Sequence, residues 1–387
     1  MTALASPGAT PHVVHVTTVH PRDDIRIFRK ECVSLARAGY RVTQVVGDGL
    51  GPAVVDGVQI VDIGPRPAGR LARMRQQPRA ALAAVLRAEP ALVHFHDPEL
   101  LPLGVTLARR GLPVVYDAHE DVPRQILTKQ WIPAPLRRPL SWVFEAYENR
   151  QAARLSAVCA ATPHIAQRFA KVAPLSVNVS NFPFLAELAP PAEPVPREQA
   201  ICYVGGLMRT RGLLQMVQAV ALLPGAKLVL CGRFEDAAFE AELRAQPGWT
   251  QVEYLGQVGR EAVRQVLARC SAGLVTLLPL PSYLDALPIK MFEYMSAELP
   301  VIASDFPLWR DIVERTGCGV CVDPADPTAI AQAVRRYLDE PARVAKAGQA
   351  GRNAVLSTYH WPVAERELLG LYARLLPGAG RIALPLA

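Results

Sequence analysis

Short β-rich runs alternate with helix-like segments along almost the whole chain, and this alternation limits the possible folds more than any other feature. Residues 25–39, for example, carry apolar side chains near helical spacing and end at Gly39, a residue type that commonly closes a helix. Such a series predicts βαβ units, and therefore parallel sheets covered by helices on both faces. In the first half of the chain the predicted strands are residues 12–19, 41–46, 58–63, 92–97, 113–119 and 155–161.

The series is interrupted once, by "FLAELAPPAEPVPREQ", where four prolines fall within residues 190–196. Proline-rich segments are stiff and extended, so this one predicts a connector between two domains. A chain of 387 residues is also too long for one ordinary core. A second set of predicted strands follows the connector, at residues 201–206, 227–232, 252–256, 272–278, 300–305 and 319–323.

We therefore predict an α/β protein of two Rossmann-like, doubly wound domains that face each other across a cleft. The N-terminal domain spans residues 1–183, a Pro-rich linker spans 184–198, and the second domain spans 199–361. Residues 362–387 form a C-terminal helix, which crosses back to the N-terminal domain, and a tail. In sheets of this kind ligands bind beyond the carboxyl ends of the strands, so we expect the chemistry there.

The composition narrows the class of protein. Half of the residues are apolar and one-fifth are charged, as in globular proteins. No apolar run approaches the length of about 18 residues that a membrane-spanning helix needs, and residues 1–11 lack the basic and apolar regions of a signal peptide. The seven cysteines are scattered, which predicts a reduced, cytoplasmic protein. Cys318 and Cys321 match C-x-x-C, but without a second pair the sequence favours buried packing over zinc binding.

The positive charge is concentrated in the first half of the chain. Residues 1–183 hold 22 Lys and Arg against 14 Asp and Glu, whereas residues 184–387 hold 20 against 21. The basic excess could face lipid headgroups, a phosphorylated acceptor or nucleic acid, or it could be an ordinary solvated surface. Because no nucleic-acid-binding motif accompanies it, we expect no nucleic-acid partner.

Glycines and arginines follow the first predicted strand of the second domain. In "YVGGLMRTRGLLQMVQAV" a strand ends at Gly205 and Gly206, and a helix begins after Gly212. Glycines let a backbone approach an anion closely, and a helix start offers unpaired N–H groups. Arg209 and Arg211 add positive charge that suits a diphosphate. The alternative is an ordinary tight turn with solvated arginines.

The stretch "PSYLDALPIKMFEYMSAELPVIASD" places two acids eight residues apart around a helix predicted to start near Pro288. Its first turn, with Ile289 and Lys290, predicts a second anion-binding element. Asp285 lies before the helix and Glu293 lies within it, so the two carboxylates should hold different parts of one ligand. Asp285 suits the hydroxyls of a hexose and Glu293 those of a ribose. The alternative is a capping acid and a helix-surface Glu–Lys pair.

Together these segments resemble the large retaining glycosyltransferase family 4. The 285–293 stretch resembles the family's E-x7-E motif, and "YVGGLMRTRG" resembles its phosphate loop. "LVHFHDPE" and "YDAHED" resemble its N-terminal H-x-H and catalytic-loop segments. The similarity runs over almost the whole chain. It implies the two-domain GT-B fold, a nucleotide-sugar donor in the second domain and an acceptor on the first.

The resemblance also implies roles for single residues. Glu293 would bind the ribose of the donor, Asp285 the hydroxyls of its sugar, and Arg211 its diphosphate. His119 would contact the transferred sugar near its anomeric carbon. Because side-chain cations and helix dipoles would stabilise the leaving diphosphate, the resemblance implies a retaining enzyme that needs no metal and no cofactor.

The sequence departs from the family pattern at four places. Gly206 replaces the first arginine of the phosphate loop, for which Arg209 could substitute, and Asp285 replaces a glutamate. Glu298 replaces a glycine after the motif helix, at a cost of about 1 kcal/mol if that position needs a positive φ. "HPRDDIRIFRKE" replaces the usual N-terminal Gly-Gly loop. The candidates in it for contact with the acceptor or a phosphate are His20, Arg22, Asp23 and Arg26.

The histidines of the first half leave alternatives open. His94 and His96, with Asp97, could be metal ligands, but no third ligand is evident nearby, so we predict no metal site. His119 closes a strand whose end should face the cleft, and a buried structural role is its alternative.

Residues 130–150 combine aromatic and basic side chains, among them Trp131, Trp142, Arg137 and Arg138. Such a segment could rest on a membrane surface and receive a lipid-linked acceptor. We favour instead a helix that packs on its own domain with charged ends.

The sequence thus predicts an enzyme that transfers a hexosyl or N-acetylhexosaminyl group from a UDP- or GDP-sugar, UDP being favoured. The acceptor is a glycan or a lipid-linked glycan in the synthesis of a bacterial surface polysaccharide or glycolipid. The expected location is the cytoplasm, with peripheral contact to the inner membrane left open. The alternatives are a nucleotide-sugar epimerase of the same fold, and a nucleotide- or glycan-binding protein without turnover.

Overall fold

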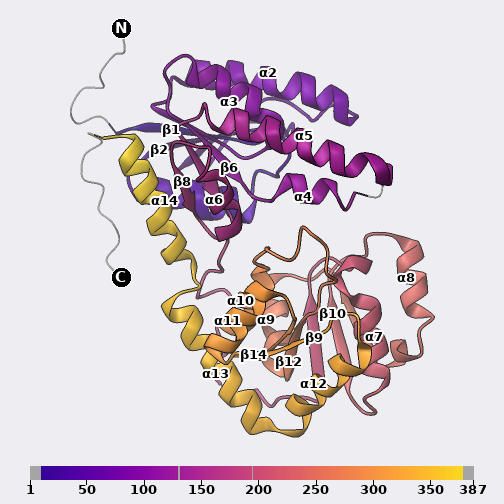
Figure 1. The fold of residues 1–387 in the computed structure, drawn as a ribbon. Coiled ribbons are helices and arrows are strands. Elements are labelled where there is room, and N and C mark those ends of the chain that lie inside the picture. Colours follow the sequence, from indigo (N-terminus) through magenta and orange to yellow (C-terminus); the bar gives the residue numbers. More distant parts are fainter. Residues whose placement is uncertain (1–9, 130, 194, 378–387) are drawn as a thin grey trace. The chain divides into compact units, whose positions relative to one another are not determined.

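The chain folds into two compact units, each built around its own parallel sheet (Figure 1). Unit 1 comprises residues 1–181 and 362–387, and unit 2 comprises residues 182–361. The segment predicted as a linker, residues 184–198, belongs to unit 2 in this division. The computed structural model describes residues 10–129, 131–193 and 195–377.

Most of the stretch on which the signal-peptide argument rests, residues 1–11, lies outside the described residues, as does the tail from residue 378 onward. Within the described part of the chain, no helix is both long enough and apolar enough to cross a membrane.

The described residues of unit 1 form an eight-stranded sheet in the order β3-β4-β2-β1-β5-β6-β7-β8. Every neighbouring pair is parallel except β3 and β4. The strands are β1 His12–Val16, β2 Arg41–Val46, β3 Ala53–Val55, β4 Val58–Asp62, β5 Leu92–Phe95, β6 Val114–Ala118, β7 Ala157–Ala160 and β8 Ser176–Asn178.

The helices of unit 1 connect these strands in the βαβ manner. They are η1 Ile25–Cys32, a widened helical turn that runs directly into α1 Val33–Arg37, then α2 Arg70–Ala88, η2 Pro98–Leu100, α3 Leu101–Ala108, α4 Val122–Ile126, α5 Ala134–Ala152, α6 Pro163–Phe169 and α14 Trp361–Leu375.

The central strands of this sheet are buried on both faces, as expected where helices cover a parallel sheet. Most of their side chains are apolar, but β1 and β5 each place a histidine at matching register, so His15 lies beside His94. Helix α14 returns to this unit near the end of the chain and buries Tyr372 fully. The interior of unit 1 therefore contains a polar group of side chains among its apolar core.

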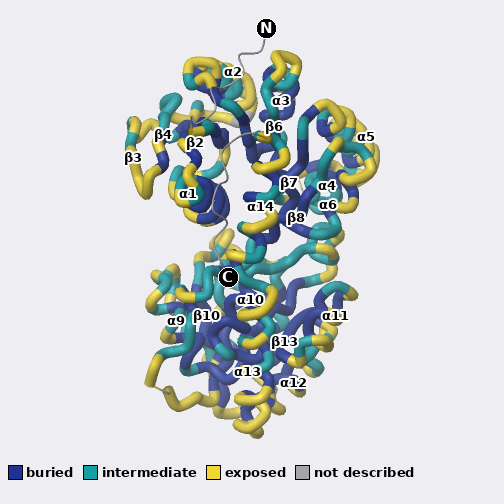
Figure 2. The backbone as a smooth tube through the Cα atoms, turned by 90° about the vertical axis from the view of Figure 1, so that its left-hand side faces the viewer, coloured by how far each residue is buried: buried dark blue, intermediate teal, exposed yellow. Residues whose placement is uncertain are grey.

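In the part of unit 2 that the structure describes, six parallel strands lie in the order β11-β10-β9-β12-β13-β14. Apolar clusters cover both faces of this sheet, and Figure 2 shows the buried strands inside each unit. The strands are β9 Ala200–Val204, β10 Lys227–Cys231, β11 Val252–Gly256, β12 Ala272–Val275, β13 Val301–Ser304 and β14 Gly319–Val322.

The helices of unit 2 alternate with its strands. They are η3 Arg209–Arg211, α7 Leu213–Ala221, α8 Ala237–Arg244, η4 Pro247–Gln251, α9 Arg260–Arg269, α10 Ile289–Ser296, α11 Pro307–Thr316, α12 Pro327–Asp339 and α13 Pro341–Ser357.

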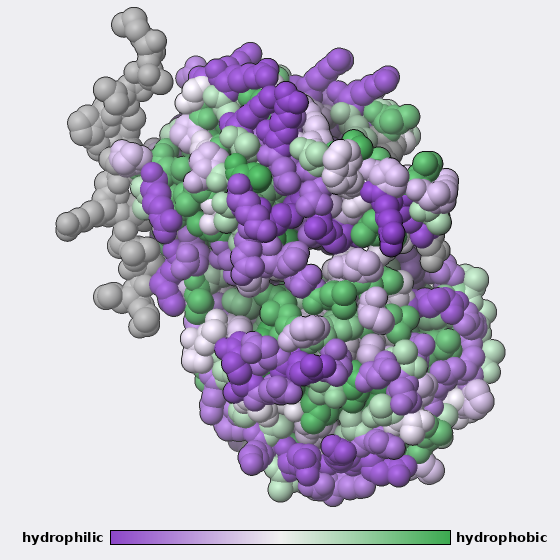
Figure 3. Space-filling model, in the orientation of Figure 1, coloured by the Kyte–Doolittle hydropathy of each residue, from purple (hydrophilic) through white to green (hydrophobic). Residues whose placement is uncertain are grey.

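All the strands predicted from the sequence are confirmed, mostly with ends one to three residues shorter than predicted, because the last residues form the turns. Two strands were missed, β3 and β8. Each has three residues, too few for an alternating or continuous apolar pattern to be recognised. None of the seven cysteines, all within the described residues, forms a disulfide, and Cys318 is buried in the core as predicted. On the face shown in Figure 3, hydrophobic side chains are interspersed among hydrophilic ones, as on ordinary protein surfaces.

Candidate active site

The turn after β9 brings its backbone against a buried lysine. Gly205 has a φ of 137°, and a Cβ at this position would lie 2.8 Å from Lys290 Nζ. Gly232, at the end of the neighbouring strand, is equally constrained, since its Cβ would lie 1.9 Å from the carbonyl oxygen of Gly205. Only glycine fits at residues 205 and 232 without displacing other atoms. The C-terminal end of β9 and Lys290 of α10 can therefore lie in direct contact.

Lys290 lies in the first turn of α10 and is almost completely buried. Its ammonium group lies 3.8 Å from the centroid of the Tyr203 ring and has no hydrogen-bond partner among the described residues. Burial, with the nearby charge of Arg211, lowers the pKa of Lys290 well below its ordinary value. Arg211 Nε is likewise buried without a hydrogen-bond partner there. An anion bound to the two groups would satisfy both of them.

Glu293 lies one turn further along α10 and is paired with an arginine that the sequence analysis missed. Arg260, the first residue of α9, places Nη1 2.8 Å from Glu293 and Nη2 2.8 Å from Glu187. The carboxylate of Glu293 is therefore held in a fixed orientation, with only 9% of its side chain exposed. The sequence separates these partners by 33 residues or more, so no local pattern marked Arg260.

Asp285 lies in the loop between β12 and α10 and is exposed. Two neighbours fix this loop: Tyr283 shares a hydrogen bond of 3.2 Å with Thr210, and the indole of Trp309 donates to the carbonyl oxygen of Ala286 at 2.7 Å. The loop of Asp285 is thus tied to the loop of the arginines. Helix α10 begins at Ile289, with Pro288 as the residue just before it, one position later than predicted.

The two arginines of η3, in the loop after β9, have different surroundings. The guanidinium of Arg209 forms a two-pronged ion pair with Glu242 of α8 and lies over the ring of Phe239. Arg211 is the one whose charge acts on Lys290. Of the predicted unit 2 residues, the structure therefore brings together Gly205, Arg211 and Lys290, with Glu293 on the same helix as Lys290, whereas Arg209 is engaged at the surface.

In unit 1, His119 directly follows β6 and is held by two polar neighbours. Its Nε2 lies 3.3 Å from Asp117 Oδ2 and 3.1 Å from His96 Nδ1, while 16% of its side chain remains exposed. Because β6 ends at the carboxyl edge of a parallel sheet, His119 lies where ligands bind in such sheets.

A chain of hydrogen bonds leads from His119 into the interior. His96 Nε2 lies 2.9 Å from His15 Nδ1, and His15 Nε2 lies 2.9 Å from the hydroxyl of Tyr372 on α14. The same hydroxyl lies 2.9 Å from His94 Nδ1. Burial lowers the pKa of His96 to about 4 and those of His15 and His94 well below the ordinary value, so these three rings are neutral at neutral pH. Neutral imidazoles both donate and accept, so the chain can fix the ring orientation of His119.

A buried ion group lies beside this chain. Arg26 contacts Asp117 at 2.9 Å and Glu31 at 3.1 Å. Burial by itself would raise the pKa of Asp117, but the charges of Arg26 and His119 lower it well below its ordinary value. Burial and the nearby Asp117 raise the pKa of Glu31 well above the ordinary value. Of the two acids, Asp117 is therefore the one whose surroundings favour the charged form, and Glu31 the one whose surroundings favour the protonated form.

This group is relevant to whether the histidines of unit 1 could bind a metal ion. In the part of the chain that the structure describes, Glu31, His94, His96 and Asp117 bring potential ligand atoms within 4.8 Å of one another. They could together hold a cation, although Arg26 already supplies positive charge to the two carboxylates. Asp97, considered with the histidines, lies elsewhere: its Oδ2 accepts from the hydroxyls of Thr17 and Thr18.

The predicted acceptor residues lie in three different places. Arg22 and Asp23 line one surface depression, where Arg22 is fixed by ion-pair contacts of 2.7 and 2.5 Å to Asp48. The ring centroids of His20 and His119 lie 5.0 Å apart. Arg26 is a correction. It is 4% exposed and bound to Asp117, so it stabilises the interior and cannot be an acceptor contact at the surface.

For the described residues 131–150 the favoured interpretation, a helix that packs on its own unit, is confirmed, although both tryptophans are exposed. Helix α5 does pack on its own unit, through Ser141, Glu148 and Ala152. Trp131, ahead of the helix, is 66% exposed, and Trp142 within it is 72% exposed.

Comparison with solved structures defines the fold. Sucrose-phosphate synthase from Thermosynechococcus elongatus aligns with a TM-score of 0.77 and 19% identity, over 94% of this chain and 99% of that one. The Anabaena protein Alr3699/HepE, solved in complex with UDP and glucose, aligns with a TM-score of 0.72 and 14% identity, over 94% of this chain and all of that one. The fold is therefore GT-B, the two-unit fold of glycosyltransferases.

Sequence comparison gives the family. Residues 188–354 match the model "Glycosyl transferases group 1", and residues 27–179 match "Glycosyltransferase Family 4". The MMP alpha-(1->4)-mannosyltransferase of Mycolicibacterium hassiacum is 23% identical over 73% of this chain and 70% of its own length. The alpha-maltose-1-phosphate synthase of Mycolicibacterium smegmatis is 28% identical over 48% of this chain and 53% of its own length. The chain belongs to the family 4 (group 1) glycosyltransferases.

Proposed function

We propose that the protein is a retaining glycosyltransferase that transfers a hexosyl-type group from a nucleotide diphosphate sugar to a glycan or lipid-linked acceptor. The observation that carries the proposal is the pair of buried cationic atoms, Lys290 Nζ and Arg211 Nε, which lack hydrogen-bond partners among the described residues. A buried amino group and a buried guanidinium N–H that both lack hydrogen-bond partners are unfavourable. A diphosphate supplies the charge and the acceptor oxygens that both groups need.

The donor that we propose is a UDP-sugar. Support comes from the similarity in fold to the Anabaena HepE protein, which was solved with UDP-glucose as well as with UDP and glucose. In this arrangement the diphosphate would contact Gly205, Arg211 and Lys290. The carboxylate of Glu293, held by Arg260, would accept hydrogen bonds from the ribose hydroxyls, and Asp285 would bind the sugar.

His119 is the residue that we propose to contact the transferred sugar. Its Nε2 faces Asp117 and His96, which leaves the other ring nitrogen for the substrate. The buried carboxylate of Asp117, 3.3 Å from Nε2, would hold the ring in place as the diphosphate leaves. No metal is assigned a role, because Lys290 and Arg211 supply the cationic charge. The pathway that we propose is the cytoplasmic synthesis of a bacterial surface polysaccharide or glycolipid.

The first test is a calorimetric titration of the full chain with UDP-, GDP-, ADP- and dTDP-sugars. We expect the tightest binding for a UDP-sugar, and for Lys290→Met we expect affinity to fall by about tenfold or more, because a charge-assisted contact is lost. Lys227→Met, at an exposed lysine of the same unit, is the matched control and should bind like the wild type. Equal affinity in the two variants would contradict the diphosphate site.

The second test separates binding from turnover. His119→Ala should leave donor affinity nearly unchanged and lower the rate of nucleotide release, whereas Glu293→Gln should mainly weaken affinity. NMR analysis of the glycosylated product should show the same anomeric configuration as in the donor, and a chelator should not lower the rate. Isomerised sugar nucleotide without any acceptor would indicate an epimerase instead. Donor binding without nucleotide release would indicate a binding protein.

A further inference from the structure

Helix α5 carries an apolar stripe that faces away from its own unit. Leu136, Pro139, Leu140, Val143 and Tyr147 recur at the spacing of one helical face, and all five are exposed. Leu136 and Val143 are each 55% exposed. A stripe of this kind normally faces a core, but here the buried positions of the helix are Ser141, Glu148 and Ala152.

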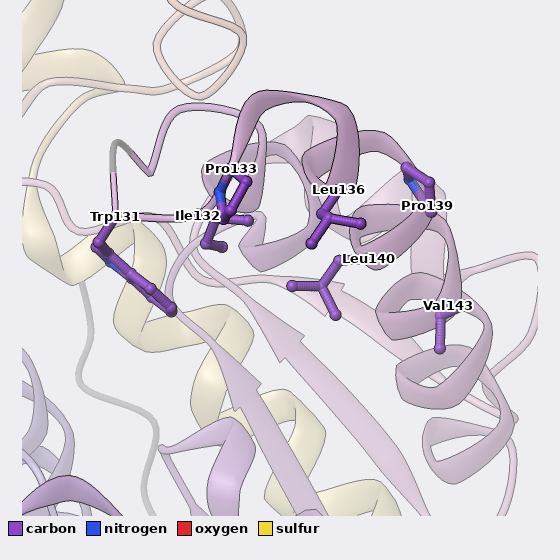
Figure 4. A pocket seen from close by; sticks show the side chains of 7 residues that line it. All are labelled: Trp131, Ile132, Pro133, Leu136, Pro139, Leu140 and Val143. Carbon is purple, nitrogen blue, oxygen red and sulfur yellow. The ribbon is translucent and has the colours of Figure 1, made fainter.

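Trp131 extends the stripe, and Trp142 flanks it, about 100° around the helix from Val143. Trp131, just before the helix, lines one depression together with Ile132, Pro133, Leu136 and Leu140, as Figure 4 shows. Trp142 lies beside Val143 on the helix and is the more exposed of the two tryptophans. We define the α5 apolar face as Trp131, Leu136, Pro139, Leu140, Trp142, Val143 and Tyr147. Large apolar side chains gathered in this way on a surface mark an interaction site.

Exposed basic residues lie near the α5 apolar face, whereas the acidic residues of the helix are paired with arginines. Both acidic residues of the helix are neutralised by arginines from other elements, Glu145 by Arg124 and Glu148 by Arg168. Arg138 and Arg150 on the helix are exposed, and Lys129 just ahead of it is exposed as well. The face therefore combines an apolar centre, exposed indole rings and a positive rim.

We propose that the α5 apolar face binds the surface of an anionic phospholipid bilayer. The positive rim is complementary to anionic headgroups, and tryptophan is the side chain that favours the boundary between headgroups and acyl chains. A helix with an apolar face and basic flanks lies in the plane of that boundary. The proposal depends on α5 alone and holds whatever donor the protein uses.

Cosedimentation of the full chain with phospholipid vesicles tests the proposal. We expect binding to vesicles of phosphatidylcholine with about one-third phosphatidylglycerol, weaker binding to phosphatidylcholine alone, and release by salt. The variant L136Q/L140Q/V143Q should lower the fraction bound by about tenfold or more, since three apolar anchors are lost. R138Q/R150Q should lose most of the preference for anionic vesicles.

The matched control is V54Q/L71Q/L222Q, which changes three exposed apolar residues elsewhere on the molecule and should bind like the wild type. All three variants should keep the wild-type circular dichroism and the wild-type affinity for nucleotide. A failure of vesicle binding therefore remains distinct from a failure of the donor site. Tryptophan emission should shift to shorter wavelength on vesicles, and W142F should reduce that shift.

Two results would overturn the proposal. One is equal vesicle binding by the wild type and L136Q/L140Q/V143Q, or no binding by either. The other is that the wild type self-associates in solution without binding vesicles, whereas the triple variant is a monomer. That result would make the α5 apolar face an interface between copies of this chain.

Discussion

The hydroxyl of Tyr372, near the end of α14, lies 2.9 Å from Nε2 of His15 on the first strand. The same oxygen lies 2.9 Å from Nδ1 of His94. A phenol has one proton, so Tyr372 donates to one of these rings and accepts from the other. The tautomers of the two rings are therefore linked, and through His96 they set whether its Nδ1 donates to His119 or accepts from it.

Removal of this hydroxyl should therefore affect both stability and turnover. Tyr372→Phe leaves two buried ring nitrogens without a partner, which should lower the free energy of unfolding by about 1–3 kcal/mol. Turnover should fall more than donor affinity, because the orientation of His119 is loosened. Urea denaturation and a nucleotide-release assay measure the two effects. Tyr337→Phe, at a buried tyrosine of unit 2, is the control and should keep normal turnover. An unaltered rate in Tyr372→Phe would separate the histidine chain from catalysis.

Glu298 closes α10 in a conformation that glycine adopts more easily. Its φ is 53°, and the NH of Leu299 bonds to the carbonyl oxygen of Tyr294, the pattern of a Schellman helix end. The sequence analysis anticipated a cost of about 1 kcal/mol if this position needed a positive φ, and the structure shows that it does. Glu298→Gly should raise the free energy of unfolding by about 0.5–1 kcal/mol. Ala297→Gly, at a neighbouring residue with negative φ, should lower it. A less stable Glu298→Gly would show that the side chain makes up for the strain.

At Gly205 the addition of a single methyl group should be enough to harm the proposed donor site. In Gly205→Ala the new Cβ would lie 2.8 Å from Lys290 Nζ, at a φ of 137° that alanine rarely adopts. We expect a loss of about 1–3 kcal/mol in stability and weaker nucleotide binding, because the ammonium group must move. At Gly206 a Cβ would find its nearest neighbour 3.7 Å away, so Gly206→Ala should keep its stability. Similar melting curves and affinities for the two alanine variants would contradict the close contact.

The buried histidines should make stability depend on pH. Burial lowers the pKa of His94 well below its ordinary value near 6.5, so below that pH the unfolded chain binds a proton that the folded chain does not. Stability is therefore full above about pH 6.5 and is lost as the pH falls. His94→Gln removes this proton-binding group. The slope of the free energy of unfolding against pH, between pH 4.5 and 6.5, should therefore fall by about 1 kcal/mol per pH unit. The raised pKa of Glu31 acts in the opposite direction, but equally in both proteins. Parallel stability curves would show that His94 is protonated in the folded state.

The strand pattern, the unit 2 glycine turn and the place of Lys290 in the first turn of a helix could be predicted because each depends on residues close together in the sequence. Arg26 could not, because its partner Asp117 lies 91 residues away and a lone arginine is expected at the surface. Arg260 was missed for the same reason, since its pairing with Glu293 joins two helices. The stripe on α5 has the period of a core-facing helix, and the period does not tell which side of a helix faces its own unit.

Unit 1 is assembled from both ends of the described chain, whereas unit 2 is continuous. On a ribosome, residues 182–361 are therefore complete and free to fold before α14 emerges. Until then the first unit lacks Tyr372, whose hydroxyl joins His15 to His94. The histidine chain that leads to His119 can close only after α14 has been synthesised, which is later than the synthesis of the whole of unit 2.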